Sequence, residues 1–152
     1  MNETRDKNIL YQSKEVTVIT ECHGNVYTIT YKIHETPGQT KCKEMLDVSL
    51  KFIRFCEADI ILILKSKSSD LEIPSAGACL CVTQFFIEHN KIVQSRLKGV
   101  CFKVKQKDEQ VECALAGFLK VSPLPCEVMV VDDKEEFADA QAQMISKKLR
   151  QT

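Results

Sequence analysis

The residues best placed for chemistry in this chain lie in the segment 71–82, whose sequence is LEIPSAGACLCV. Its one hydroxyl, that of Ser75, stands between Pro74 and Gly77, just before a run of small and apolar residues. A serine at the start of a helix accepts a hydrogen bond from one of the unpaired backbone N–H groups there. A phosphate on the same oxygen would also meet the positive end of the helix dipole. Ser75 is therefore predicted to be either a simple N-cap or a site of phosphorylation.

The three histidines are weaker candidates. His23 falls in a predicted turn, His34 near the end of a predicted strand, and His89 beside Glu88 on a predicted helix. The sequence contains no G-x-S-x-G or H-E-x-x-H motif and no glycine-rich phosphate loop. These observations argue against an enzyme, although a small enzyme that uses Ser75 or a cysteine stays open as an alternative.

The eight cysteines are scattered among apolar neighbours, and no two of them form a C-x-x-C pair. In a chain of 152 residues without a signal segment, such cysteines are expected to be reduced and mostly buried. We therefore expect neither a metal site nor a cofactor. The cysteines are Cys22, Cys42, Cys56, Cys79, Cys81, Cys101, Cys113 and Cys126.

Charge and hydropathy limit the partners of the chain. Twenty-one basic residues balance twenty-one acidic ones, so no net field attracts nucleic acid or an acidic membrane surface. The opening residues, MNETRDKNIL, are polar and charged, and no apolar run approaches the ~20 residues that span a bilayer. We expect a cytoplasmic protein of one domain, residues 1–152 with a polar tail over about 1–10, that neither binds nucleic acid nor inserts into a membrane.

Hydrophobic periodicity predicts the first half of the fold. Residues 15–22 and 25–33 are rich in β-branched residues and Tyr, and His23-Gly24 separates them, which indicates a hairpin. Apolar residues then recur at helical spacing over about 40–57. The continuous apolar run 58–64, ADIILIL, is typical of a central strand that is covered on both faces.

The second half alternates in the same way. The pattern predicts a helix over about 76–93, a strand over 99–105, a short helix over 108–118 and a strand over 126–131. Asp132 and Asp133 then begin a last helix that ends in basic residues. Together these elements predict an α/β fold, with a mixed β-sheet of about five strands and four or five helices packed on it.

This order places Ser75 beyond the carboxyl end of the predicted central strand, where open α/β sheets bind ligands and partners. Small residues around it would let another backbone approach closely. The polar segment 65–70 borders the same place, either as a solvated loop or as part of a contact surface. The predicted partner-binding residues are Ser66, Ser68, Ser69, Asp70, Pro74, Ser75, Ala76, Gly77 and Ala78.

The sequence resembles the STAS domains, a family that includes bacterial anti-anti-sigma factors and cytosolic modules of anion transporters. The family pattern runs hairpin, helix, buried strand, Asp-Ser-x-Gly motif, helix, strand, glycine-containing helix, strand and last helix. Residues 73–77, IPSAG, fall at the serine motif; residues 111–118, VECALAGF, resemble the glycine-containing helix; and residues 133–140, DKEEFADA, resemble the start of the last helix. The match in element order covers roughly residues 12–146, and it implies a STAS-like fold.

In the anti-anti-sigma branch, a serine kinase that is also the anti-sigma factor phosphorylates the serine of this motif. The resemblance therefore implies Ser75 as the phosphoacceptor and such a kinase as the protein partner. Pro74 stands in place of the family's aspartate, and Ser66 stands about where another acidic residue follows the central strand. The first hypothesis is an anti-sigma factor antagonist with a phosphorylation switch. The alternative is an accessory module of a transporter or signalling complex that is never phosphorylated.

Overall fold

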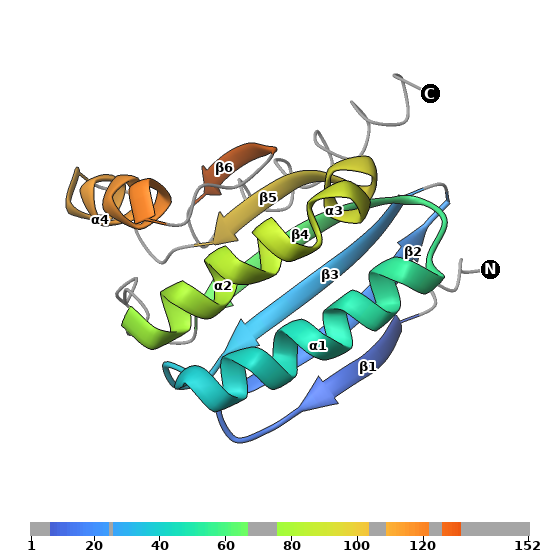
Figure 1. Cartoon of the computed structure of the whole chain (residues 1–152), viewed down its shortest axis with the longest axis horizontal. Coiled ribbons are helices and arrows are strands. Elements are labelled where there is room, and N and C mark those ends of the chain that lie inside the picture. Colours follow the sequence, from blue (N-terminus) through green and yellow to red (C-terminus); the bar gives the residue numbers. More distant parts are fainter. Residues whose placement is uncertain (1–6, 25, 67–75, 104–108, 122–125, 132–152) are drawn as a thin grey trace.

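The computed structural model describes residues 7–24, 26–66, 76–103, 109–121 and 126–131. Within these residues the chain forms six strands and four helices (Figure 1). The strands are β1 (Lys7–Gln12), β2 (Val16–His23), β3 (Val26–Ile33), β4 (Asp59–Ser66), β5 (Leu97–Lys103) and β6 (Glu127–Val131). The helices are α1 (Gln39–Phe55), α2 (Ala76–Glu88), α3 (Asn90–Arg96) and α4 (Glu109–Val121).

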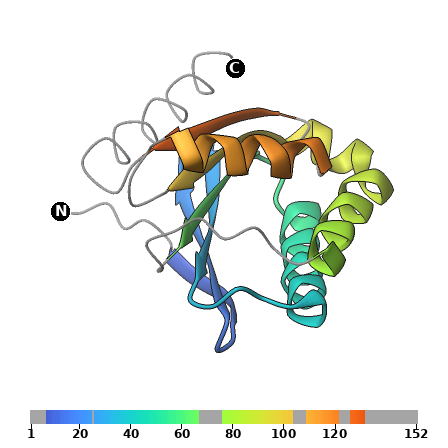
Figure 2. The ribbon, with the colours of Figure 1, turned by 90° about the vertical axis from the view of Figure 1, so that its left-hand side faces the viewer.

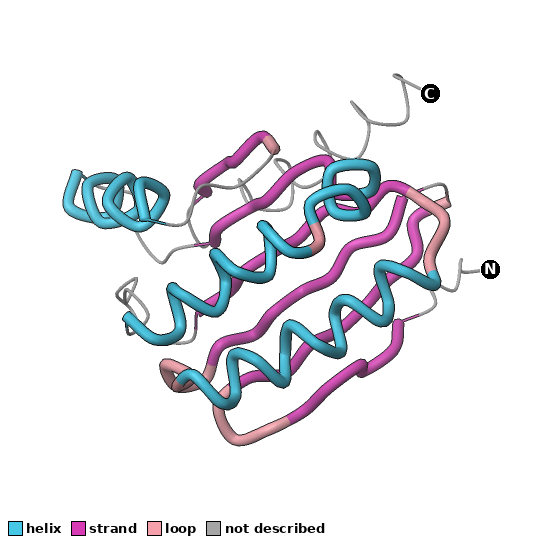
Figure 3. Tube along the Cα trace, in the orientation of Figure 1, coloured by secondary structure: helices cyan, strands magenta, loops and turns pink. Residues whose placement is uncertain are grey.

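All six strands belong to one sheet, and each lies beside its neighbours in the sequence, in the order β1-β2-β3-β4-β5-β6 (Figure 3). β1, β2 and β3 pair antiparallel, whereas β3, β4, β5 and β6 pair parallel. Parallel neighbours need a long crossover between them, and the helices lie in these crossovers. The predicted mixed sheet of an α/β fold is confirmed.

The β2–β3 hairpin forms where the sequence predicts it. The two strands pair along their whole length, so that Val18 lies opposite Tyr31 and His23 opposite Val26. Gly24 follows β2 with a φ of +73°, in the left-handed region that side chains with a Cβ disfavour. A larger residue at position 24 would therefore strain the turn.

Helices α1, α2 and α3 lie over one face of the sheet (Figure 2). α1 contacts both α2 and α3, and α4 contacts α2. Crossovers between parallel strands are almost always right-handed, so successive crossovers that advance in one direction across a sheet place their helices on the same side. The strand order thus accounts for the layer of helices.

β4 lies in the middle of the sheet, between β3 and β5. Ile60 is fully buried in the core under the helices. Ile61 and Ile63 alternate with it, so they point to the opposite face, and they are buried as well. Each such side chain stabilises the fold by about 1.5–3 kcal/mol. The prediction that the run 58–64 forms a central strand covered on both faces is confirmed.

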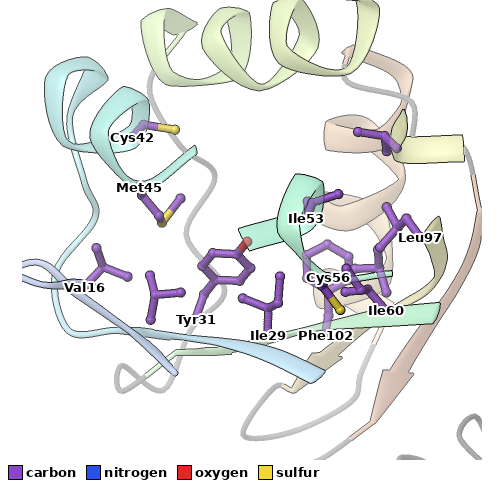
Figure 4. Packing of buried hydrophobic residues seen from close by; sticks show 13 residues of the cluster. Val16, Ile29, Tyr31, Cys42, Met45, Ile53, Cys56, Ile60, Leu97 and Phe102 are labelled. Carbon is purple, nitrogen blue, oxygen red and sulfur yellow. The ribbon is translucent and has the colours of Figure 1, made fainter. Parts of the chain in front are cut away.

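α1 packs its apolar side on the sheet, which confirms the helix predicted over about 40–57. Figure 4 shows Met45 on this side of α1 across from Val16, Ile29 and Tyr31 of the sheet. The buried residues of α1 recur at helical spacing, as Cys42, Met45, Ser49, Leu50 and Ile53.

One polar contact lies inside this core. The Tyr31 hydroxyl lies 2.8 Å from Ser49 Oγ, and Ser49 donates its own hydrogen to the Met45 carbonyl oxygen, also at 2.8 Å. Because the Ser49 hydrogen is engaged there, Tyr31 is the donor to Ser49. Burial raises the pKa of Tyr31 to about 12, so the hydroxyl keeps its hydrogen at neutral pH.

A residue of α3 completes the carboxyl end of α1. Arg96 Nη1 donates to the Ile53 carbonyl oxygen at 2.9 Å and also to the carbonyl oxygen of Cys56. The last carbonyls of a helix have no partner within the helix, and a cation there meets the negative end of the helix dipole. Arg96 therefore supplies hydrogen bonds that the end of α1 cannot supply for itself.

β1 corrects the expectation of a polar tail over residues 1–10. It begins at Lys7 and pairs with β2, so the sheet has six strands rather than about five. Near its end the Tyr11 hydroxyl donates to Glu44 Oε1 on α1 at 2.6 Å, and this bond lowers the pKa of Glu44. β1 is an edge strand whose first half is exposed, Ile9 included. It therefore lacks the apolar alternation by which strands are predicted.

The second predicted helix, over 76–93, is divided at His89 into α2 and α3. The His89 N–H bonds to the Phe85 carbonyl oxygen at 3.0 Å and closes α2, and both His89 and Asn90 are weak helix formers. The elements predicted over 99–105, 108–118 and 126–131 correspond to β5, α4 and β6, with ends displaced by a few residues. The helix predicted from Asp132 lies outside the described residues.

We predict that Ser49→Ala lowers the free energy of unfolding more than Tyr31→Phe does. Ser49→Ala leaves the buried Tyr31 hydroxyl without its acceptor, which costs about 1–3 kcal/mol, whereas after Tyr31→Phe Ser49 still donates to Met45. Adding Tyr31→Phe to Ser49→Ala removes the unpaired hydroxyl and should restore part of the stability. Urea denaturation of the three variants measures these differences. Purely additive losses would contradict the contact.

Candidate functional site

The predicted site lies where the parallel strands end, along the side of the sheet formed by their carboxyl ends. We call this side the carboxyl edge of the sheet, as distinct from an edge strand. β4 ends there at Ser66, α2 begins there at Ala76, and α1 begins at the same edge at Gln39 (Figure 1). Of the predicted contact residues, Ser66 and the backbone of residues 76–78 lie at this edge. The remaining predicted residues lie outside the described part of the chain: Ser68, Ser69, Asp70, Pro74 and Ser75.

The polar segment 65–70 begins inside the sheet. Lys65 and Ser66 are the last two residues of β4, and they lie opposite Lys32 and Ile33 of β3 in parallel register. The expectation of a loop from residue 65 is therefore wrong for these two residues. β4 continues past its apolar run because β3 extends far enough to pair with it.

α2 has the sequence of a buried helix, AGACLCVTQFFIE, with few polar residues. Phe85 and Phe86 pack against the core. Elsewhere on the helix, however, Leu80 is 54% exposed and Ile87 is 71% exposed. These two residues lie two turns apart with the exposed Gln84 between them, so all three share one side of the helix. We call Leu80, Gln84 and Ile87 the outer α2 surface.

The neighbouring helix α1 presents a different outer side. Its exposed positions include five charged residues, Lys43, Glu44, Asp47, Lys51 and Arg54. Such a side is typical of a helix that faces water, whereas a helix that is apolar on all sides is typically buried. Exposed apolar patches on folded proteins mark interaction sites. The outer α2 surface is therefore a candidate contact surface.

The sequence interpretation did not select Leu80 or Ile87. It ended the predicted contact surface at Ala78 and relied on small residues. A signal was present, because residues 76–88 offer almost no polar side on which a surface helix could face water.

Comparisons with protein-family models, curated proteins and solved structures gave no match. Among the described helices, none combines the length and apolar character needed to cross a bilayer. Over the same described ranges, no three His, Cys, Asp or Glu residues are grouped so that they could hold a metal ion.

The three histidines occupy separate places. His34 Nε2 lies 3.0 Å from Thr17 Oγ1, and His23 Nε2 lies 3.1 Å from Thr28 Oγ1. His89 marks the break between α2 and α3. Each is held by its own local contacts, so the structure does not bring the histidines into one site.

Seven of the eight cysteines have described side chains, and all seven are free thiols. Cys42, Cys56 and Cys101 are buried, three others are half-buried, and Cys113 on α4 is exposed. The expectation of a mostly buried set is therefore wrong in part; the Cys79 side chain lies outside the described ones. Burial raises the pKa of Cys101 to about 11 and also raises that of Cys56. Both are therefore protonated at neutral pH and poor nucleophiles.

We predict that a thiol reagent labels Cys113 in the native protein well before Cys101. Cys113 is exposed, whereas packing and a raised pKa protect Cys101. Peptide mass spectrometry after brief labelling identifies the modified residues, and labelling in denaturant provides the control in which both react. Equal native rates for the two cysteines would contradict the described packing.

Proposed function

We propose that this chain is a regulatory protein of the STAS type that acts by binding another protein, in the manner of an anti-sigma factor antagonist. The partner is a serine kinase of the anti-sigma type, and phosphorylation of Ser75 controls the binding. In this proposal the chain works in the cytoplasm, performs no catalysis and uses no cofactor.

The outer α2 surface carries the proposal. Leu80 and Ile87 keep large apolar side chains in water, and covering such surface releases roughly 25 cal/mol per Å². The centre of a protein interface is apolar and its rim is polar. Leu80 and Ile87 have the apolar character of a centre, while the charged outer side of α1 has that of a rim. α2 also begins directly after Ser75 in the sequence.

The order of elements also supports the proposal. The chain runs through the β2–β3 hairpin, α1, the buried β4, α2 with α3, β5, α4 and β6. The STAS pattern has the same succession, with its serine motif directly before the helix that α2 corresponds to. The pattern has its glycine at the end of the corresponding helix, whereas α4 continues past Gly117 to Val121.

A phosphate on Ser75 would act on this surface through its charge. α2 has no acidic residue in its first turn, and the first N–H groups of a helix have no partner within it. A phosphate accepts such N–H groups and is favoured by the helix dipole, so folding tolerates the modification. Against an apolar partner, however, about −1.5 to −2 charges would have to lose their water, so the complex would separate.

The first test is Ile87→Lys. A cation on the outer α2 surface should weaken partner binding about tenfold or more, because apolar contacts exclude unpaired charge. The matched control is Ile9→Lys on β1, since Ile9 is similarly exposed, at 63% against 71% for Ile87. Affinity capture from the native host, followed by titration of the captured partner, compares the two variants.

Both substitutions are on the surface and should change the free energy of unfolding by less than about 0.5 kcal/mol. Circular dichroism checks that both variants remain folded. Equal retention of the partner by Ile87→Lys and Ile9→Lys would contradict docking on the outer α2 surface.

The second test compares Ser75→Asp with Ser75→Ala. Aspartate is a good N-cap and adds charge, whereas alanine adds none. Ser75→Asp should therefore lose the partner that Ser75→Ala retains, with the partner bound to unmodified protein as the reference. If Ser75→Asp binds as well as Ser75→Ala while Ile87→Lys does not bind, the docking surface stands and the phosphorylation switch is refuted.

A further inference from the structure

A second exposed apolar site lies at the other edge of the sheet, where the parallel strands begin. An open hollow of about 540 Å³ is formed there between the carboxyl end of α1 and the starts of β3 and β4. Aromatic and small side chains form most of its wall, and two charged residues border it. The lining residues are Tyr27, Lys51, Phe52, Phe55, Cys56, Glu57 and Ala58.

The aromatic residues of the hollow differ in how they are held. The Tyr27 and Phe52 rings pack edge to face, with centroids 5.6 Å apart, so this wall is formed in advance. Phe55, the last residue of α1, is 88% exposed. Arg96 bonds to the carbonyl oxygens of Ile53 and Cys56, on either side of Phe55 in the sequence. The structure therefore presents a projecting phenyl ring directly beside an aromatic hollow.

The two charged residues at the border have opposite signs. Lys51 and Glu57 are both exposed, and neither has an ion-pair partner among the residues that the structure describes. The border therefore has no net charge, and each of its charges is available to a partner. A partner that complements this patch has a projecting aromatic group, an aromatic hollow, one cation and one anion. The same patch on a second copy of the chain has all four features.

We infer that two copies of this chain associate through this hollow about a two-fold axis. In such an interface every contact occurs twice. Phe55 of each copy enters the hollow of the other, against Tyr27 and Phe52, and Lys51 of each copy faces Glu57 of the other. The surface lies at the edge of the sheet opposite to the start of α2, so this inference does not depend on the proposed function.

The small size of the patch indicates a weak association. A contact around a single hollow buries little surface, and interfaces of small buried area typically form transient complexes. We therefore expect a monomer–dimer equilibrium that depends on protein concentration. Sedimentation velocity of the full chain, over a concentration series extending to the millimolar range, measures it. Sedimentation as a monomer throughout that series would overturn the inference.

Phe55→Ala tests the central contact. Loss of a central aromatic side chain should weaken dimerisation about tenfold or more, and because Phe55 is exposed in the monomer the variant should stay folded. Ile9→Ala is the matched control, since it removes an exposed apolar group elsewhere. This control should keep the wild-type equilibrium. If the control abolishes the dimer while Phe55→Ala retains it, the copies associate through another surface and the inference is overturned.

Exchange of charge tests the two-fold arrangement itself. Lys51→Glu alone places two glutamates opposite each other, and Glu57→Lys alone places two lysines opposite each other, so each variant should dimerise less than wild type. A mixture of the two variants restores opposite charges at both contacts and should form mixed dimers. Sedimentation of the mixture at matched total concentration shows the recovery. A mixture that stays as monomeric as its components would refute the proposed pairing.

Discussion

The consecutive order of the parallel strands is the constraint on which the rest of this structure depends. Because β3, β4, β5 and β6 each lie beside their predecessor and point the same way, every crossover begins at one edge of the sheet and returns to the other. α1 and α2 therefore begin at one edge, and α1 ends at the opposite edge (Figure 3). The aromatic hollow lies at the edge where α1 ends, whereas the outer α2 surface runs along α2 from Leu80 to Ile87, next to the last residue of that helix.

The neighbouring helices α1 and α2 differ in the polarity of the side that each exposes to water. α1 has a buried apolar side and a charged outer side, and contacts from outside the helix hold it at several points. Tyr11 bonds to Glu44 near its start, Tyr31 to Ser49 in its middle, and Arg96 to carbonyls at its end. α2 is apolar on its outer side as well. The sheet and its core account for α1 except for the exposed Phe55 at its end, and they leave Leu80 and Ile87 of α2 exposed.

Periodicity predicted the parts of the fold in which burial is one-sided or complete. The hairpin, α1 and the buried β4 all follow this rule, and so their residues carried enough information. Features that depend on residues distant in the sequence could not be predicted. β1 is largely exposed and forms a strand because it pairs with β2. Arg96 bonds to the end of α1 although 43 residues separate it from Ile53. The candidate site was predicted by position and by a family resemblance, which drew attention to small residues near Ser75. This prediction did not include Leu80 and Ile87, because an apolar residue on a helix is usually assigned to the core.

The contact between Arg96 and the end of α1 also bears on the order in which the chain becomes native. The carbonyl oxygens of Ile53 and Cys56 have no hydrogen-bond donor within α1. Their donor is the guanidinium of Arg96, about forty residues further along the sequence. During synthesis, which proceeds from the amino terminus, α1 leaves the ribosome long before Arg96 does. The helix can form its turns early, but its last carbonyls stay bound to water until α3 has been made and has docked. The hydrogen bonds of these two carbonyl groups are thus native only in a chain that has been translated past residue 96.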